Sequence, residues 1–170
     1  MNIIKLEPSR WEEYKNLRLE ALKKEPTAFA ASYEEKVGKE DEYWQNQLKK
    51  FQEAEEDSMW FAEVNSQLVG LTGWYRSNTE KLRHSASVYA VYIKPEYRGK
   101  GIAKELIKKV LDEIESKPEI VKIDLNVNTK NETAANLYKK LGFEIVGTLH
   151  KEIFVDGEYF DEYEMEKIVR

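Results

Sequence analysis

The amino-acid sequence predicts an α+β fold in which a mixed β-sheet carries helices on both faces. The patterns run as two helices, three strands, a helix, a strand, a helix and a final pair of strands. This order is neither a regular strand–helix alternation nor a series of strands alone. The strand–helix–strand unit over 87–127 predicts a right-handed parallel crossover, whereas both strand pairs predict antiparallel hairpins.

The first helix is expected over 9–24. Ser9 and Glu12 have the spacing of a capping box, and apolar residues then recur at helical spacing. Pro26 ends this helix because proline lacks the N–H that a helix needs. The following stretch, 27–33, is apolar but has no regular period, which is unusual for a surface loop.

A second helix and three strands are expected next. The charged stretch 34–54 carries one narrow apolar stripe at helical spacing and predicts a surface helix. Two aromatic-rich runs, 59–64 and 68–75, flank a short polar loop and predict a hairpin. The run 87–93 is almost wholly apolar and predicts a central strand that is covered on both faces.

The C-terminal half contains the clearest helix, 101–115, whose apolar residues fall on one face. The stretch 121–127 alternates apolar and polar residues, which is the period of a strand. Asn131 is expected to cap a short helix, and Gly142 suits the left-handed position just after that helix.

The chain ends in a second predicted hairpin. Its strands, 144–155 and 158–168, meet at Asp156-Gly157, a dipeptide suited to a type I′ turn. No repeat, low-complexity tract or linker divides the sequence. We therefore expect residues 1–170 to form one domain, which agrees with the usual domain size.

Composition excludes several classes of function. The chain has 27 basic and 32 acidic side chains and a net charge of −5, so we expect neither a nucleic acid nor a membrane as partner. It has no cysteine and only two histidines, and we expect no metal. No apolar run has the length of a signal peptide or a membrane span, so we expect a cytoplasmic protein. The sequence leaves the oligomeric state open, a homodimer included.

The segment most typical of a ligand site joins the apolar strand to the amphipathic helix. Gly99 and Gly101 allow the backbone to approach a ligand closely, and N–H groups at a helix N-terminus bind anions. Arg98 and Lys100 add positive charge. The alternative is a tight turn that needs glycine only for its geometry. The segment matches neither a P-loop nor a dinucleotide-binding fingerprint.

Two motifs resemble those of the GNAT superfamily of acetyl-CoA-dependent N-acetyltransferases. The family signature Gln/Arg-x-x-Gly-x-Gly/Ala follows a central strand, and the turn here reads Arg98-Gly99-Lys100-Gly101-Ile102-Ala103. The family's Asn-led helix, which ends in Leu-Tyr-x-x-x-Gly-Phe, is matched by the segment from Asn131 to Phe143. The first helix and 26–35 also resemble the family's opening, so the resemblance spans nearly the whole chain.

The resemblance implies a mostly antiparallel, twisted sheet of about six to seven strands flanked by about four helices. It also implies that the amides of the turn hold the pyrophosphate of acetyl-CoA. A bulge in the preceding strand would let its backbone pair with pantetheine, and an N–H near Val91 would face the thioester oxyanion. The cofactor-binding residues that it implies are Val91, Tyr92, Ile93, Arg98, Gly99, Lys100, Gly101, Ile102, Ala103, Asn131 and Asn136.

Tyr138 is the catalytic residue that the resemblance implies. The family's helix tyrosine points its hydroxyl at the coenzyme sulfur and can protonate the departing thiolate. A phenol with a pKa of about 10 is still protonated at neutral pH. The alternative is a core aromatic on the helix face that Ala134 and Leu141 share.

The amine side of the site is less determined. Some family members use a glutamate on the central strand to take the proton from the amine, but 87–93 contains no carboxylate. Glu34 and Glu35 are substitutes by location, or simply the exposed start of a helix. In the family, the first two helices and their connection usually line the acceptor cleft. The residues expected to bind the acceptor are therefore Phe29, Tyr33 and Glu34.

We expect an enzyme that transfers acetyl from acetyl-CoA directly to a primary amine of a small molecule or a protein. Proximity and oxyanion stabilisation would supply most of the rate. The acidic chain is compatible with a cationic acceptor such as a polyamine, but net charge does not choose among amines. One alternative is a catalytically idle domain that senses acyl-CoA, and another is an unrelated nucleotide-binding protein.

Overall fold

The computed structural model describes all residues from 1 to 170, and seven strands form one sheet in the order β1-β2-β3-β4-β5-β7-β6. Neighbouring strands are antiparallel except β4 and β5, which run parallel. The predicted α+β class, the parallel crossover and both hairpins are confirmed. The strands are β1 (Asn2–Ile4), β2 (Asp57–Val64), β3 (Gln67–Arg76), β4 (Ser85–Ile93), β5 (Lys122–Asn128), β6 (Glu144–Val155) and β7 (Glu158–Ile168).

Five α-helices and four short 3₁₀ turns connect these strands. The helices are α1 (Trp11–Lys24), α2 (Tyr33–Val37), α3 (Asp41–Glu53), α4 (Ile102–Glu115) and α5 (Glu132–Lys140). The turns are η1 (Pro8–Arg10), η2 (Pro26–Ala28), η3 (Glu80–Leu82) and η4 (Pro95–Tyr97).

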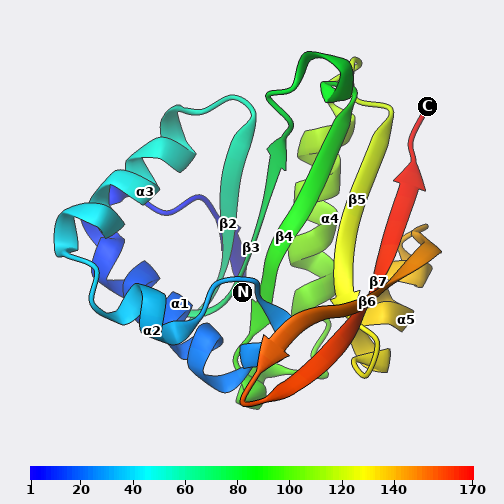
Figure 1. The fold of residues 1–170 in the computed structure, drawn as a ribbon. Helices are drawn as coiled ribbons and strands as arrows, with labels where there is room; N and C mark the ends of the chain where they lie inside the picture. The colour runs from blue at the N-terminus through cyan, green and yellow to red at the C-terminus, as the bar shows by residue number, and fades with distance from the viewer.

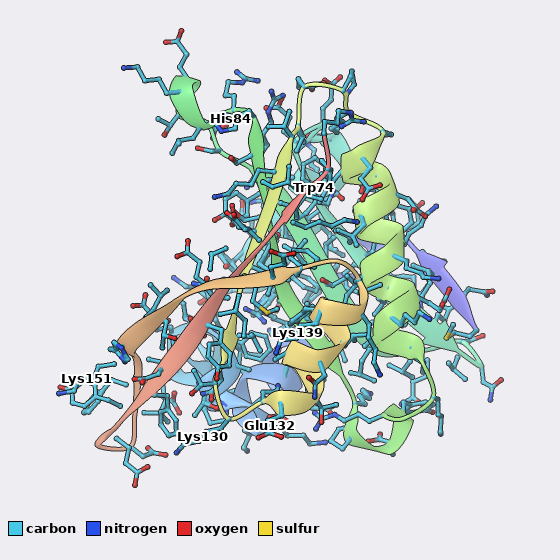
Figure 2. The ribbon with its side chains drawn as sticks, turned by 90° about the vertical axis from the view of Figure 1, so that its right-hand side faces the viewer. Trp74, His84, Lys130, Glu132, Lys139 and Lys151 are labelled. Atoms are coloured by element: carbon cyan, nitrogen blue, oxygen red, sulfur yellow. The ribbon has the colours of Figure 1, made fainter.

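The helices cover the two faces of the sheet in separate groups (Figure 1). Helices α1 and α3 pack on β2 and β3 around a core that includes Leu17, Trp44 and Phe61. Helices α4 and α5 pack on the opposite face, where Ile107 and Tyr138 belong to one cluster; Figure 2 shows the two helices beside each other. We call these the α1 face and the α4 face.

The N-terminal helices depart from the sequence prediction at their boundaries. The capping box expected from Ser9 and Glu12 is wrong: Ser9 lies inside η1, and no side chain caps α1. A capping box forms instead between Ser32 and Glu35 at the start of α2. The single helix expected over 34–54 is two helices, because the chain turns at Gly38 and is extended again before α3 begins.

The first strand, β1, was absent from the sequence prediction. It has three residues and pairs with β2, so its conformation comes from a strand distant in sequence. A segment of this length is too short to show a period. The type I′ signal between β6 and β7 is confirmed, since Asp156 and Gly157 both have positive φ.

Strand β4 is bulged and leaves β5 early. Between its pairings with Leu71 and Gly73 of β3 it contains an additional residue, and Ala90 there has a φ of 56°. Only Ser85–Ser87 pairs with β5, and the two strands then diverge toward the C-terminal end of β4 (Figure 1). The remaining backbone of β4 therefore has no strand partner on its β5 side.

Candidate active site

The turn between β4 and α4 presents free backbone donors at the start of a helix. Gly99 and Gly101 have φ values of 74° and 80°, which disfavour other residues, and a Cβ on either would meet open space. The N–H groups of Gly99, Lys100 and Gly101 donate to no backbone carbonyl, and no side chain caps α4. Unused donors of this kind, at the positive end of a helix dipole, are suited to binding an anion.

The two cationic side chains of this turn are held by the protein itself. Arg98 donates through Nε to the Ile93 carbonyl at 3.0 Å and pairs with Glu25 at 2.6 Å. Lys100 Nζ donates to the Glu96 carbonyl at 3.0 Å. The charge of Arg98 is therefore shared with Glu25, whereas the backbone N–H groups of the turn are unused.

The β4 residues in the predicted cofactor set present backbone to the gap beside β5. Val91 directly follows the bulge and packs against the core of the α4 face. The side chains of Tyr92 and Ile93 are buried, and the Tyr92 hydroxyl donates to Glu20 at 3.1 Å. A ligand in the gap would thus meet N–H and C=O groups, as strand pairing requires.

Helix α5 begins at the predicted cap and carries the other predicted residues. Asn131 Oδ1 accepts from the Ala134 N–H at 3.1 Å, which confirms the cap and leaves the Asn131 amide N–H₂ free. Asn136 is exposed on the same helix. The side-chain N–H₂ groups of both residues are therefore accessible, and neither donates a hydrogen bond within the protein.

Tyr138 is largely buried on α5 and still has an unused hydroxyl. Its ring is 5% exposed and packs edge-on against Phe143, with 6.1 Å between ring centroids. Burial raises the pKa of the hydroxyl well above its ordinary value, so it is protonated at neutral pH. The hydroxyl makes no hydrogen bond within the protein, yet it is not among the fully buried polar atoms that lack a partner. The side chain is both a core aromatic and an available proton donor.

The residues expected to bind the acceptor differ in exposure, although Phe29 and Tyr33 both contact the core of the α1 face. Phe29 is 7% exposed and lies beneath the guanidinium of Arg18, so it is part of the core. Tyr33 is half-buried, and Glu34 is exposed in the first turn of α2. Glu35 closes the capping box of α2, which gives it a structural role.

A cavity of about 200 Å³ lies on the α1 face among α1, α3 and β4. Arg18 and Tyr89 line it, together with Asp57 at the start of β2. None of these residues was predicted from the sequence to be functional. Arg18 could not be recognised because a charged residue within an amphipathic helix ordinarily faces solvent.

A second side chain that the sequence analysis missed is Glu162 of β7. It is 7% exposed and lies opposite Asn128, at the end of β5. Burial and the neighbouring Glu152 raise its pKa, and a hydrogen bond with Asn126 offsets part of this change. The alternation of β7 placed Glu162 with Glu164 on the polar side of the strand, which is why it resembled surface.

Comparison with known proteins identifies the family. A model of the acetyltransferase (GNAT) family matches residues 9–143. Spermidine N(1)-acetyltransferase of Escherichia coli (strain K12) is 37% identical over 45% of this chain and 41% of its own. L-amino acid N-acetyltransferase AaaT of the same organism is 29% identical over 51% of this chain and 53% of its own. The chain thus spans about half the length of these relatives.

Solved structures share the fold over the whole chain. An acetyltransferase of the GNAT family from Streptococcus pneumoniae has a TM-score of 0.88 at 20% identity, covering 99% of both chains. The protein yncA from Salmonella typhimurium, solved with its cofactor acetyl-CoA, has a TM-score of 0.83 at 16% identity and covers 100% of this chain and 94% of that one. None of the helices here has the length and apolar character needed to cross a membrane. Because the family model matches most of the chain, this protein belongs to the GNAT acetyltransferase family.

Proposed function

We propose that this chain is an N-acetyltransferase that moves an acetyl group from acetyl-CoA directly to a primary amine, with residues 1–170 acting as one domain. The observation that carries the proposal is the uncapped start of α4, with its free N–H groups at Gly99 and Gly101, beside the gap between β4 and β5. Family membership supports acetyl-CoA as the donor.

The residues present fit acetyl-CoA in two of its parts, the pyrophosphate and the pantetheine. The N–H groups from Gly99 to Ala103 would hold the pyrophosphate at the helix N-terminus. The unpaired backbone of β4 from Val91 to Ile93 would bind the pantetheine amides, with Asn131 and Asn136 at the opposite wall. This division explains why the turn needs glycine whereas the strand needs only an open edge.

The chemistry assigns one role to each group. The amine nitrogen attacks the thioester carbon, and the backbone N–H near Val91 donates to the oxyanion that forms. The C–S bond then breaks, and the Tyr138 hydroxyl gives its proton to the leaving thiolate. We assign the proton lost by the amine to the Glu162 carboxylate, which lies opposite Asn128 at the end of β5, beyond the last pairing of β4 with β5, and whose pKa burial raises. Glu162 replaces Glu34 and Glu35 in this role.

A substitution in the turn tests the proposal. Gly101→Val should weaken acetyl-CoA binding by more than about 100-fold, since a β-branched side chain would occupy the space above the donors and strain the left-handed backbone. Calorimetric titration with acetyl-CoA measures the affinity. Gly157→Val is the matched control: Gly157 also has open space and a φ of 84°, but it lies in the β6–β7 turn.

Unchanged affinity in Gly101→Val would contradict the role of the turn. Thiol release from acetyl-CoA in the presence of an amine panel then tests the transfer itself. The alternative is an acyl-CoA sensor, which the lack of a carboxylate on β4 favours. Binding without thiol release on any amine would support that sensor.

A further inference from the structure

Two polar atoms in this structure are buried without a hydrogen-bond partner, and both belong to residues that line one cavity. They are Arg18 Nη1 and Trp44 Nε1, and the cavity is the one of about 200 Å³ on the α1 face. Buried donors are almost always paired in native proteins, so such groups need an explanation. Both atoms are donors, which means that the missing partner is an acceptor.

Arg18 carries a charge that no acidic side chain compensates. Its guanidinium carbon lies 4.6 Å from the centre of the Phe29 ring, which supports its flat face. The titratable neighbours that act on it are the tyrosines Tyr14, Tyr43 and Tyr89, and burial lowers its pKa from the usual value. Arginine nevertheless remains charged at neutral pH. Arg18 is thus a desolvated cation, and its Nη1 group has no hydrogen-bond acceptor within the protein.

The rest of the lining does not supply the missing negative charge. Lys36 and Lys50 also line the cavity, and Asp57 is its single carboxylate. Asp57 already accepts from Lys50 at 2.5 Å and from the Tyr89 hydroxyl at 3.2 Å. The cavity therefore has an excess of positive charge, although the whole chain has a net charge of −5.

The cavity lies next to the proposed point of acetyl transfer. Tyr89 is one of its lining residues, and Ala90 at the bulge and Val91 follow it directly on β4. A molecule in the cavity would thus approach the bulge from the α1 face. The gap proposed for pantetheine opens at the same stretch of strand.

We propose that the acceptor is a small amine that also carries a carboxylate, as an amino acid does, and that Arg18 binds this carboxylate. The inference rests on the proposed acetyl transfer and names its substrate class. A guanidinium edge matches a carboxylate geometrically, and charge-assisted hydrogen bonds of this kind are strong. The rings of Tyr14 and Trp44 and the side chain of Met59 give the cavity an apolar wall for the remainder of the acceptor.

A polyamine fits this cavity poorly. Its second ammonium group would face Arg18 and the two lysines in a partly desolvated space, where like charges repel. The names of the relatives include both a polyamine and amino acids as acceptors, so they do not decide between the two classes. The excess positive charge of the cavity lining favours an amino acid over a polyamine.

The test uses matched sets of amines with the full chain and saturating acetyl-CoA. Each set contains an L-amino acid, its carboxamide and its decarboxylated amine, and spermidine is measured in parallel. We expect kcat/KM from thiol release to be at least about 10-fold higher for the carboxylate member. Comparable or higher values for the carboxamide, the decarboxylated amine or spermidine would overturn the inference and leave the acetyl transfer itself established.

Substitutions connect the preference to Arg18. Arg18→Met should raise KM for the amino acid by about 10- to 100-fold and abolish its advantage over the carboxamide, with KM for acetyl-CoA unchanged. Arg18→Lys should keep part of the advantage. Arg83→Met is the control, because Arg83 pairs with Glu56 and lies outside the cavity. A preference for carboxylates that survives in Arg18→Met would overturn the assignment of this residue.

Binding separates this inference from the proposed function. If no amine releases thiol, calorimetry with the amino acids in the presence of coenzyme A still reports on the cavity. Binding that Arg18→Met abolishes would support the carboxylate site in a protein without transferase activity. No binding of any amino acid would overturn it.

Discussion

Glu113 on α4 and Arg18 on α1 are both charged side chains that point from a helix toward the sheet, one on each face. Glu113 receives a full set of hydrogen bonds, whereas Arg18 has an unpaired donor. Burial opposes ionisation of Glu113, but its hydrogen bonds outweigh that cost and lower its pKa to about 2. Its donors are Lys5 at 2.8 Å, Ser58 at 2.7 Å, the Trp60 indole at 2.6 Å and the Trp74 indole at 2.9 Å.

The difference shows which buried charges stabilise the fold and which have another use. Glu113 joins α4 to β2 and β3, and Trp74 in this network lies between the sheet and α4 (Figure 2). Arg18 costs stability, because its desolvation is not repaid within the protein. Tyr138 and Glu162 are two further polar side chains whose pKa is raised by burial, although neither has a fully buried atom without a partner. Such groups are the ones to examine for ligand contacts.

The largest effect on stability should come from Glu113→Gln. The shift of the pKa from 4.5 to about 2 corresponds to about 3 kcal/mol of stabilisation at neutral pH, which the variant loses. Denaturant unfolding at pH 7 measures this free energy. Glu115→Gln is the control on the same helix: Glu115 pairs with Lys167 at the surface, and its loss should cost at most about 0.5 kcal/mol.

The pH dependence of Glu113→Gln adds a second check. Because the folded state has the lower pKa, the stabilisation is complete above about pH 4.5 and is lost as the pH falls toward 2. The difference between wild type and variant should therefore narrow over that range. A variant as stable as wild type at pH 7 would show that the network adds no stability, and the contrast with Arg18 would fail.

Tyr138→Phe should affect the rate and leave the stability nearly unchanged. Loss of the proton donor should lower kcat by about 10- to 1000-fold with little change in acetyl-CoA affinity. Removing the hydroxyl breaks no hydrogen bond within the protein, so the melting temperature should stay within about 2 °C of wild type. Steady-state kinetics and thermal unfolding measure the two effects. Tyr159→Phe, on the exposed hairpin, is the control, and wild-type turnover in Tyr138→Phe would leave Tyr138 a core aromatic.

Arg18→Met should make the protein more stable, in contrast to Glu113→Gln. An unpaired buried charge is replaced by an apolar side chain, and we expect a gain of about 1 kcal/mol, or about 2–4 °C in melting temperature. Thermal unfolding without ligands measures it. A loss of stability would mean that the contact with Phe29 outweighs the desolvation of the charge. Arg18 would then be, like Glu113, a buried charge that stabilises the fold.

The smallest effect on stability is expected for Glu162→Gln. The raised pKa means that the folded state holds the proton more strongly than the unfolded state, so stability falls as the pH rises through the folded pKa. The variant should be slightly more stable than wild type at pH 8, with no difference below about pH 4. Denaturant unfolding at both pH values tests this. A gain that is equal at both would contradict the assigned pKa shift.

Much of the fold could be predicted because its signals are local. The glycines before α4, the Asn131 cap and the Asp156-Gly157 turn each need only a few adjacent residues, and all three were predicted in their observed places. Predictions failed for β1, which forms because it pairs with the distant strand β2, and for one local signal, the capping box at Ser9. Ser9 and Glu12 have the right spacing for a cap, but η1 begins at Pro8 and carries Ser9 into a helical turn before α1 starts.

The candidate site divides in the same way. The turn before α4 and Tyr138 could be singled out because each lies in a motif of adjacent residues. Their roles are still predictions. It gave no indication of Arg18 or Glu162, because burial of a charged side chain depends on what packs over it. The acceptor residues expected after α1 also differ in burial, which the sequence did not indicate: Phe29 is in the core, and Glu34 is exposed.

The sequence by itself determined the order of most strands and helices, apart from β1 and the division of 34–54 into α2 and α3, and the position of the glycine turn before α4. Periodicity and glycine conformation are properties of neighbouring residues. Only the tertiary structure decided which charged groups are paired. Glu113 finds its donors on β2 and β3, far away in the chain, whereas Arg18 finds none. A hydrogen bond needs its two atoms within about 3 Å of each other, and no local pattern fixes such a distance between remote segments.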